Sequence, residues 1–186
     1  MTGLFIQLMS KQILNNSNFI IIPAFNETTV IKTVVEELIL AGYSIVIVDD
    51  GSEENLLAQV LVFTNTYYIR HAVNLGQGAA LQTGIEFALQ KKAKYLVTFD
   101  ADGQHSAADI PALLLPIQNN EADITLASRF LRPGHHNASC SRQLLLKTAR
   151  WINYLFTGLY LSDAHNGLRA MNRAAAEKVA LKENRM

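Results

Sequence analysis

The sequence predicts an α/β fold in which a mostly parallel central sheet has helices on both faces. Short apolar segments of strand length alternate along the chain with segments whose apolar residues recur at helical spacing. This alternation is typical of parallel sheets whose strands are buried on both faces. Polar residues also gather where the predicted strands end, and parallel sheets bind their ligands at that edge.

The composition is that of one globular domain. The chain has 186 residues, of which 49% are hydrophobic, and this is enough for a sizeable core. Sixteen basic residues balance sixteen acidic ones, so the totals show no sign of a nucleic-acid partner. Cys140 is the only cysteine, which excludes an internal disulfide and fits a reducing compartment such as the cytoplasm. No apolar run reaches the roughly 18 residues of a transmembrane helix. We expect residues 1–17 to be a poorly structured leader and residues 18–186 to form the domain.

The first half of the chain is expected to contain three strands, at residues 19–23, 44–48 and, more weakly, 66–71. Pro23 is expected to end the first strand because proline cannot donate to a ladder. Thr28 or Thr29 can cap a helix that ends at Gly42. A short helix at 53–60 and a longer one at 79–92 follow. The glycines of the loop 74–78 would let backbone N–H groups approach an anion at the helix start, or they simply form a turn.

The second half begins with a strand at 95–99 that contains Leu96, Val97 and Phe99. Ser106 and Asp109 can cap the next helix, and Pro111 suits its first turn. A fifth strand at 123–127, a polar loop at 131–139 and helices at about 142–159 and 173–181 complete the prediction. The helix at 142–159 is expected to pack on the core, and contact with a membrane surface is the alternative.

Asp100 and Asp102 follow the fourth predicted strand, and Gly103 breaks it. In an extended backbone two such carboxylates point the same way with Cα atoms about 6.6 Å apart, and they repel each other unless a cation lies beside them. Oxygen ligands suit Mg²⁺ or Mn²⁺. The pattern therefore indicates a metal–diphosphate site at the carboxyl edge of the sheet, and a solvated helix-capping loop is the alternative. Asn26-Glu27, Asp49-Asp50 and Ser128-Arg129 end other predicted strands.

The chain contains six motifs of note, at Ile22–Glu27, Val48–Ser52, Asn74–Ala80, Phe99–His105, Ser128–Phe130 and Asp163–Arg169. Together they resemble those of the inverting family-two glycosyltransferases, most of all the branch that contains dolichol-phosphate mannose synthase and its bacterial relatives. The resemblance runs from about Phe19 to the last residue. It implies a Rossmann-like nucleotide-sugar glycosyltransferase fold of the GT-A type with an Asp-x-Asp (DXD) metal motif.

The resemblance also implies roles for single residues. The nucleotide pocket would be lined by Pro23, Phe25, Glu27, Val48 and Asp50, and Ala101 would touch the nucleotide through its backbone. The divalent cation and the diphosphate would be held by Asp100, Asp102 and Gln104. Arg129 would meet the diphosphate or the sugar, Asp163 is the candidate base, and Arg169 is a candidate anion contact. Many relatives carry Lys where this chain has Gln77, so a direct positive charge is missing there.

The implied activity is the metal-dependent transfer of a sugar, with inversion, from a UDP- or GDP-linked donor to a polyprenyl phosphate or a cell-envelope glycan. The chain would act in the cytoplasm, with peripheral contact at the inner face of the cell membrane. A sugar hydroxyl would need a general base, whereas a polyprenyl phosphate is already anionic. The alternatives are a sugar-nucleotide nucleotidyltransferase and a nucleotide-binding remnant without transfer activity.

Some features stay open at this point. The sequence does not fix the base, the sugar or the oligomeric state. The resemblance implies further chain after Met186 that would complete the acceptor side. His105 follows the metal motif and either contacts the site or holds the turn, and His71 has no role beyond packing.

Overall fold

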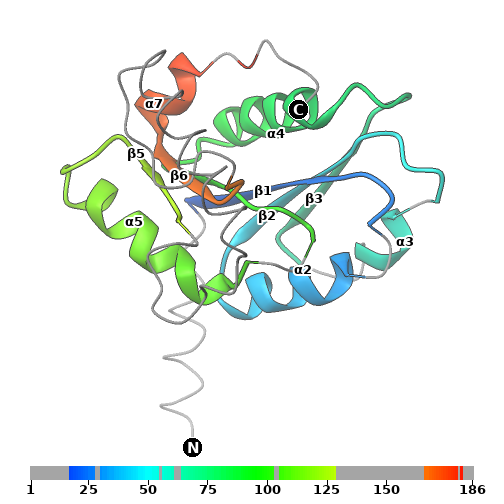
Figure 1. Cartoon of the computed structure of the whole chain (residues 1–186), viewed down its shortest axis with the longest axis horizontal. Helices are drawn as coiled ribbons and strands as arrows, with labels where there is room; N and C mark the ends of the chain where they lie inside the picture. The colour runs from blue at the N-terminus through cyan, green and yellow to red at the C-terminus, as the bar shows by residue number, and fades with distance from the viewer. Residues whose placement is uncertain are drawn as a thin grey trace, which may run out of the picture. The chain divides into compact units, whose positions relative to one another are not determined.

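The computed structural model describes residues 17–27, 30–54, 56–60, 64–102, 105–128, 166–179 and 181 (Figure 1). The chain divides into two compact units, residues 1–125 with 168–186 and residues 126–167. The sheet and its helices lie almost wholly in the first unit. Among the described residues, no helix combines the length and the apolar character needed to cross a membrane.

One mixed sheet has the strand order β3-β2-β1-β4-β6-β5. The strands β3, β2, β1 and β4 are paired in parallel with one another, and β6 runs antiparallel to β4. The predicted α/β class with a mostly parallel sheet is therefore confirmed. The strands are β1 (Asn18–Ala24), β2 (Ser44–Asp49), β3 (Thr66–Arg70), β4 (Tyr95–Thr98), β5 (Ile124–Leu126) and β6 (Arg169–Asn172).

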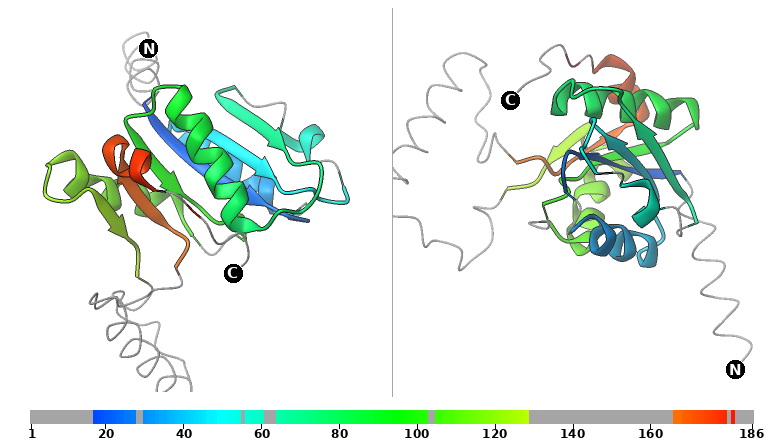
Figure 2. Two further views of the ribbon diagram at one scale, coloured as in Figure 1. Left: turned by 90° about the horizontal axis from the view of Figure 1, so that it is seen from above. Right: turned by 90° about the vertical axis from the view of Figure 1, so that its right-hand side faces the viewer.

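Helices cover both faces of this sheet (Figures 1 and 2). α2 (Ile31–Leu40), α3 (Leu57–Val60) and α5 (Ile110–Gln118) lie on one face, and α4 (Gln77–Gln90) and α7 (Arg173–Lys178) lie on the other. Because both faces are covered, β1 and β2 are buried along their whole length. This burial explains why these two strands are almost continuous apolar runs.

Helix α2 follows the predicted apolar pattern, but its N-cap is Val30 and not Thr28 or Thr29. It buries Ile31, Val34, Val35 and Leu38 along one side, as expected of an amphipathic helix on a sheet. Gly42 ends the helix with φ 86°, and the N–H of Tyr43 then donates to the carbonyl of Leu38. A residue in this left-handed conformation after the last turn is a common helix end, and glycine adopts it without strain.

The prediction that Pro23 ends β1 was wrong, because the strand continues to Ala24 and Pro23 pairs with Val48. The carbonyl of Ile21 accepts from the N–H of Phe99, and the carbonyl of Ala24 accepts from the N–H of Asp50. Alternate residues of β1 thus face β4 and β2, and Pro23 is turned towards β4. The pairing with β4 ends at Ile21, at the point where the next ladder bond would need the N–H that Pro23 lacks.

Other boundaries also differ from the prediction. α4 begins at Gln77 because Gly76, with φ 100°, is its N-cap, so Gly78 lies inside the first turn. The short helix covers only Leu57–Val60, and a 3₁₀ turn, η1 (Ala107–Asp109), precedes α5 with Ser106 as its cap. The four-residue strand β6 was missed because polar residues at both ends hide its two buried positions. The predicted helix at 142–159 and most of the leader lie outside the described residues.

Candidate functional site

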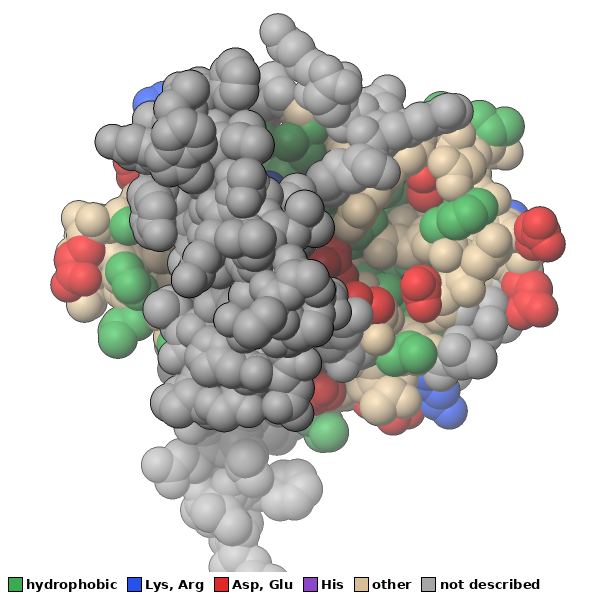
Figure 3. All heavy atoms as spheres, in the orientation of Figure 1, with side chains coloured by type: hydrophobic (Ala, Val, Ile, Leu, Met, Phe, Trp, Pro, Cys, Tyr) green, Lys and Arg blue, Asp and Glu red, His purple; other side chains and the backbone are tan. Residues whose placement is uncertain are grey.

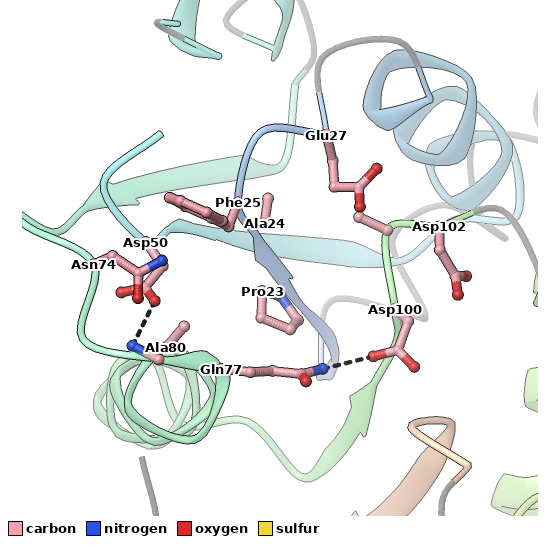
Figure 4. A pocket seen from close by; sticks show the side chains of 12 residues that line it. Pro23, Ala24, Phe25, Glu27, Asp50, Asn74, Gln77, Ala80, Asp100 and Asp102 are labelled. Atoms are coloured by element: carbon pink, nitrogen blue, oxygen red, sulfur yellow. Dashed lines mark hydrogen bonds between the residues drawn. The ribbon is translucent and has the colours of Figure 1, made fainter. Parts of the chain in front are cut away.

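A pocket of about 390 Å³ lies at the carboxyl ends of β1, β2 and β4, where the sequence predicted a ligand site (Figure 4). Its volume falls in the range usual for small-molecule sites. Residues from the ends of the three strands, together with the loop before α4 and the start of that helix, form its walls. The lining residues are Pro23, Ala24, Phe25, Glu27, Asp50, Asn74, Gly76, Gln77, Ala80, Asp100, Ala101 and Asp102.

The pocket brings together most of the residues expected around a nucleotide and its metal: Pro23, Phe25, Glu27, Asp50, Asp100, Ala101 and Asp102. Val48 is an exception, because it is not among the residues that line the pocket. Its side chain is fully buried in the core beneath α4, because neighbouring strand residues alternate between the two faces of the sheet. Gln104, Arg129 and Asp163 lie outside the described residues.

Asp100 and Asp102 lie at the same end of the pocket (Figure 4). β4 stops at Thr98 and Asp102 lies in a turn, so the two residues are not in the extended segment that we expected. Oδ1 of Asp100 accepts a hydrogen bond from Nε2 of Gln77 at 3.1 Å, and Oδ2 lies 3.5 Å from Nε2 of His105. The ring of His105 also meets that of Phe99 edge-on, which holds this turn against the core.

The pocket is acidic. Its charged lining residues are Glu27, Asp50, Asp100 and Asp102, and no Lys or Arg is among the described residues that line it. Carboxylate oxygens are the ligands that Mg²⁺ and Mn²⁺ prefer. Within the described part of the chain, however, no three His, Cys, Asp or Glu side chains cluster closely enough to hold a metal ion. Asp100 and Asp102 can therefore supply part of a coordination shell.

The adjacent residues Asp49 and Asp50 point into different surroundings. Asp49 is fully buried, and its carboxylate accepts from the N–H of Ser52 at 2.8 Å and from the hydroxyl of Tyr68 at 2.5 Å. Arg70 closes this cluster by donating from Nη2 to the carbonyl of Ser52 at 2.6 Å. Burial, and then the hydrogen bond to Asp49, raise the pKa of Tyr68 above its ordinary value. Asp49 is thus structural, and only Asp50 lines the pocket.

Asp50 is held by three donors. Nδ1 of His71 lies 2.7 Å from Oδ1 of Asp50, the N–H of Leu75 donates to Oδ1 at 2.9 Å, and the N–H of Gly76 donates to Oδ2 at 2.7 Å. Sequence reasoning assigned His71 to packing alone. The signal that could have found it is its place directly after β3, at the same carboxyl edge as the other polar residues.

The loops that follow β1, β2 and β3 are fastened to one another. The N–H of Asn26 donates to Oγ of Ser52 at 2.9 Å, and Oδ1 of Asn26 accepts from the N–H of Glu53 at 3.0 Å. Gly51, with φ 76°, approaches the next loop so closely that a Cβ there would lie 2.7 Å from the carbonyl carbon of Val73. These contacts place Phe25 and Glu27, which lie on the first loop, beside the Asp50 turn.

The fold belongs to the GT-A class of glycosyltransferases. The structure matches glucosyl-3-phosphoglycerate synthase from Mycobacterium tuberculosis with a TM-score of 0.58 and 17% identity, over 88% of this chain and 59% of that one. That synthase was crystallised with Mn²⁺, uridine diphosphate and glucosyl-3-phosphoglycerate. At this level of identity the likeness establishes the fold alone.

Sequence relationships then give the family. The family model described as glycosyl transferase family 2 matches residues 19–180. The chain is 33% identical over 175 residues to the UDP-N-acetylglucosamine–dolichyl-phosphate N-acetylglucosaminyltransferase of Methanococcus voltae. The matched region covers 84% of this chain and 70% of that protein. It is 30% identical over 170 residues to the polyprenol monophosphomannose synthase of Mycolicibacterium smegmatis, over 87% and 64% of the two chains. The chain therefore belongs to glycosyl transferase family 2 and is by family a glycosyltransferase, in the branch that the motifs predicted.

Proposed function

We propose that this chain transfers a sugar from a nucleoside diphosphate sugar to a polyprenyl phosphate, with a divalent cation held by Asp100 and Asp102. The observation that carries the proposal is the convergence of these two carboxylates with Pro23, Phe25 and Asp50 on one pocket at the carboxyl edge of the sheet. The family supplies the reaction class. Two relatives that carry dolichyl phosphate or polyprenol in their names support the acceptor.

The electrostatics of the pocket favour a metal-dependent donor site. A diphosphate entering a cavity lined by four carboxylates, with no described basic side chain among its lining residues, would be repelled. Mg²⁺ or Mn²⁺ bound by Asp100 and Asp102 would neutralise the diphosphate leaving group. Gln104 is the proposed third oxygen ligand, and Arg129 is the proposed contact to the diphosphate or the sugar.

The remaining lining residues suit a nucleoside. Glu27 and Asp50 can accept hydrogen bonds from a base N–H or from ribose hydroxyls. Phe25 is 45% exposed at the pocket, so its ring offers an apolar face to a base or a sugar. Ala101 lines the wall between the two metal-motif carboxylates, where its small side chain would let a ligand approach the backbone.

The proposed reaction is one in-line displacement. An acceptor oxygen forms a bond to the anomeric carbon of the sugar while the bond from that carbon to the β-phosphate oxygen breaks, and the nucleoside diphosphate leaves with the bonding electron pair. Attack from the opposite side inverts the configuration. A phosphate oxygen is already anionic, so Asp163 would orient the acceptor, and it would act as a base only towards a hydroxyl. A polyprenyl acceptor would bring the enzyme to the inner face of the cell membrane as a peripheral protein.

Calorimetry tests the donor site. UDP and GDP would be titrated into the protein with Mn²⁺ or with a chelator, and we expect one nucleotide to bind only with the metal. Asp102→Asn should abolish this metal-dependent binding while the circular dichroism spectrum stays unchanged. Glu121→Gln is the matched control, since it removes a carboxylate that follows α5 and does not line the pocket. Equal affinity of wild type and Asp102→Asn would refute the assignment of the metal site.

A transfer assay tests the reaction. The protein would be incubated with Mn²⁺, vesicles containing a polyprenyl phosphate, and UDP-N-acetylglucosamine or GDP-mannose. We expect a lipid-linked sugar whose anomeric configuration, read by NMR, is opposite to that of the donor. Release of pyrophosphate from a sugar phosphate and a nucleoside triphosphate would instead indicate a nucleotidyltransferase. Nucleotide binding without any transfer would indicate a remnant.

A further inference from the structure

Most of the hydrogen-bond acceptor sites of the Asp50 carboxylate are occupied by donors within the protein. Oδ1 faces two donors, Nδ1 of His71 and the N–H of Leu75, and Oδ2 accepts from the N–H of Gly76. Each carboxylate oxygen offers about two lone-pair sites, so Oδ1 has none left and Oδ2 keeps one. Asp50 is only 3% exposed, yet it lines the pocket. It can therefore offer a ligand a single acceptor, whose direction depends on how the carboxylate is held.

His71 connects this carboxylate to helix α4. Its Nδ1 lies 2.7 Å from Oδ1 of Asp50, its Nε2 lies 3.0 Å from Oγ1 of Thr83, and its side chain is 10% exposed. A carboxylate can only accept, so Nδ1 is the nitrogen that carries the proton. In the neutral ring Nε2 then accepts from the hydroxyl of Thr83. The hydroxyl of Thr83 therefore favours the tautomer that donates to Asp50.

We propose that His71, oriented by Thr83, is a positioning residue for donor binding. It fixes Oδ1 of Asp50, so that the free acceptor on Oδ2 is presented to the ligand. Neither His71 nor Thr83 lines the pocket, so both act through Asp50 and neither is a catalytic residue. The identity of the ligand as a nucleotide rests on the proposed function, whereas the contact between His71 and Asp50 does not.

The physical reason is the cost of an incompletely satisfied carboxylate in a nearly dry site. Without His71, Oδ1 would lose one of its two donors, and a buried acceptor left unpaired is unfavourable. The carboxylate would then turn towards water in the pocket. That rotation would weaken the backbone bonds from Leu75 and Gly76, which lie directly before α4, and it would misdirect the acceptor on Oδ2.

Two substitutions of His71 separate positioning from simple packing. In His71→Asn the amide nitrogen takes the place of Nδ1 and can still donate to Asp50, but the contact with Thr83 is lost. In His71→Gln the amide takes the place of Nε2 and can still meet Thr83, but no donor faces Asp50. A packing role would make the smaller Asn the more damaging change. The positioning role predicts the reverse for ligand affinity.

The test is calorimetric titration of the full chain with UDP and with GDP in the presence of Mn²⁺. For the nucleotide that wild type binds, we expect His71→Gln to weaken affinity by about tenfold or more, and His71→Asn by less than about threefold. Thr83→Val should weaken it by a few-fold, and Thr83→Ser, which keeps the hydroxyl, should not. Unchanged affinity in His71→Gln, or equal losses in the two His71 variants, would overturn the proposal.

Amide hydrogen exchange, followed by NMR without nucleotide, provides a second readout. We expect the amides of Leu75 and Gly76 to exchange faster in His71→Gln than in wild type or in His71→Asn. Unchanged exchange would overturn the positioning role. If wild type binds neither nucleotide, the proposed function fails, and amide exchange alone decides whether His71 holds Asp50. Thr83→Val serves the same two measurements if a His71 variant does not fold.

Discussion

The side-chain amide Nε2 of Gln77 lies 3.1 Å from Oδ1 of Asp100, so the first residue of α4 donates a neutral hydrogen bond to a proposed metal ligand. A neutral donor orients the carboxylate without cancelling its charge. Figure 3 shows acidic side chains beside apolar ones near the centre of this face of the molecule. With Gln at this position, the proposed cation would supply the positive charge that the described lining residues do not offer to a diphosphate.

Gln77→Lys should change the amount of Mn²⁺ that nucleotide binding requires, because it adds a positive charge to the pocket. The ammonium group would pair with Asp100 and compete with the cation, and it would also attract the diphosphate directly. A partly exposed ion pair contributes about 0.5–1 kcal/mol. We therefore expect the Mn²⁺ concentration for half-maximal nucleotide binding to rise by about two- to fivefold, and binding in chelator to become detectable. Calorimetric titration of nucleotide at a series of Mn²⁺ concentrations measures both effects.

Gln90→Lys is the matched control for this prediction. It makes the same change at the exposed last residue of α4, at the opposite end of the helix from the pocket. The metal requirement should then equal that of wild type. If both variants shift the requirement equally, the effect comes from net charge, and Gln77 has no specific relation to Asp100.

Gly51→Ala should damage the pocket as well as stability. Gly51 has φ 76°, and a Cβ there would lie 2.7 Å from the carbonyl carbon of Val73 and 2.8 Å from the nitrogen of Asn74. Both are backbone atoms of the loop that leads to the N–H donors for Asp50, so the loop has to move. We expect at least a tenfold loss of nucleotide affinity together with about 1–3 kcal/mol of lost stability. Calorimetry and urea unfolding measure the two effects.

Gly42→Ala separates strain from displacement. Gly42 also has a positive φ, 86°, but it ends α2 and does not line the pocket. Alanine there should cost about 1–2 kcal/mol of stability and leave nucleotide affinity unchanged. Equal losses of affinity in the two variants would show that any destabilisation weakens the site, which contradicts a specific role for the Gly51 contact.

The apolar periodicity predicted the part of the fold that burial controls. The strands β1 and β2 and the helix α2 lie near their expected positions because wholly apolar or amphipathic segments have few alternatives. Pro23 shows where local rules were insufficient. β1 continues through this proline because its pairing with β2 extends to Ala24, although its pairing with β4 has already ended at Ile21. β6 shows a second limit, because it is a strand through its pairing with β4, a tertiary contact that its own four residues do not indicate.

The sequence predicted the candidate site where polar motifs follow the ends of strands. It did not predict which side chains would point into the pocket and which into the core. Asp49 and Asp50 look equivalent in sequence, yet Asp49 is fully buried with Tyr68, and Asp50 lines the pocket. Val48 was expected at the nucleotide and lies in the core. His71 was left to packing because its importance arises from Asp50 and Thr83, which are 21 and 12 residues away along the chain.

Tyr68→Phe should lower stability in a way that depends on pH. At neutral pH the variant loses the hydrogen bond to the buried carboxylate of Asp49, which we expect to cost about 1–3 kcal/mol. In the folded protein the pKa of Tyr68 is raised by burial and by Asp49. A raised pKa contributes stability that is present below the ordinary tyrosine value of about 10 and is lost as the pH rises above it.

The difference in free energy of unfolding between wild type and Tyr68→Phe should therefore narrow as the pH rises from about 9 to about 11. Urea unfolding at several pH values measures this difference. Tyr43 also has a raised pKa, caused by burial, but it is present in both proteins, so its contribution cancels. A difference that stays constant or widens with pH would contradict the proposed link between Tyr68 and Asp49.

Gly84→Ala should destabilise the protein, although alanine is the better helix former by about 1 kcal/mol. Gly84 lies in the middle of α4 where the helix crosses β1, and a Cβ there would overlap Cγ2 of Ile21 and lie 3.3 Å from Cγ2 of Val48. Overpacking of a core typically costs about 1–3 kcal/mol, so we expect a net loss of about 1–2 kcal/mol in urea unfolding. Ile21→Leu removes the Cγ2 branch while keeping the volume. The double variant should therefore be more stable than the sum of the single changes by about 1 kcal/mol or more, and strict additivity would show that helix and strand do not meet at this pair.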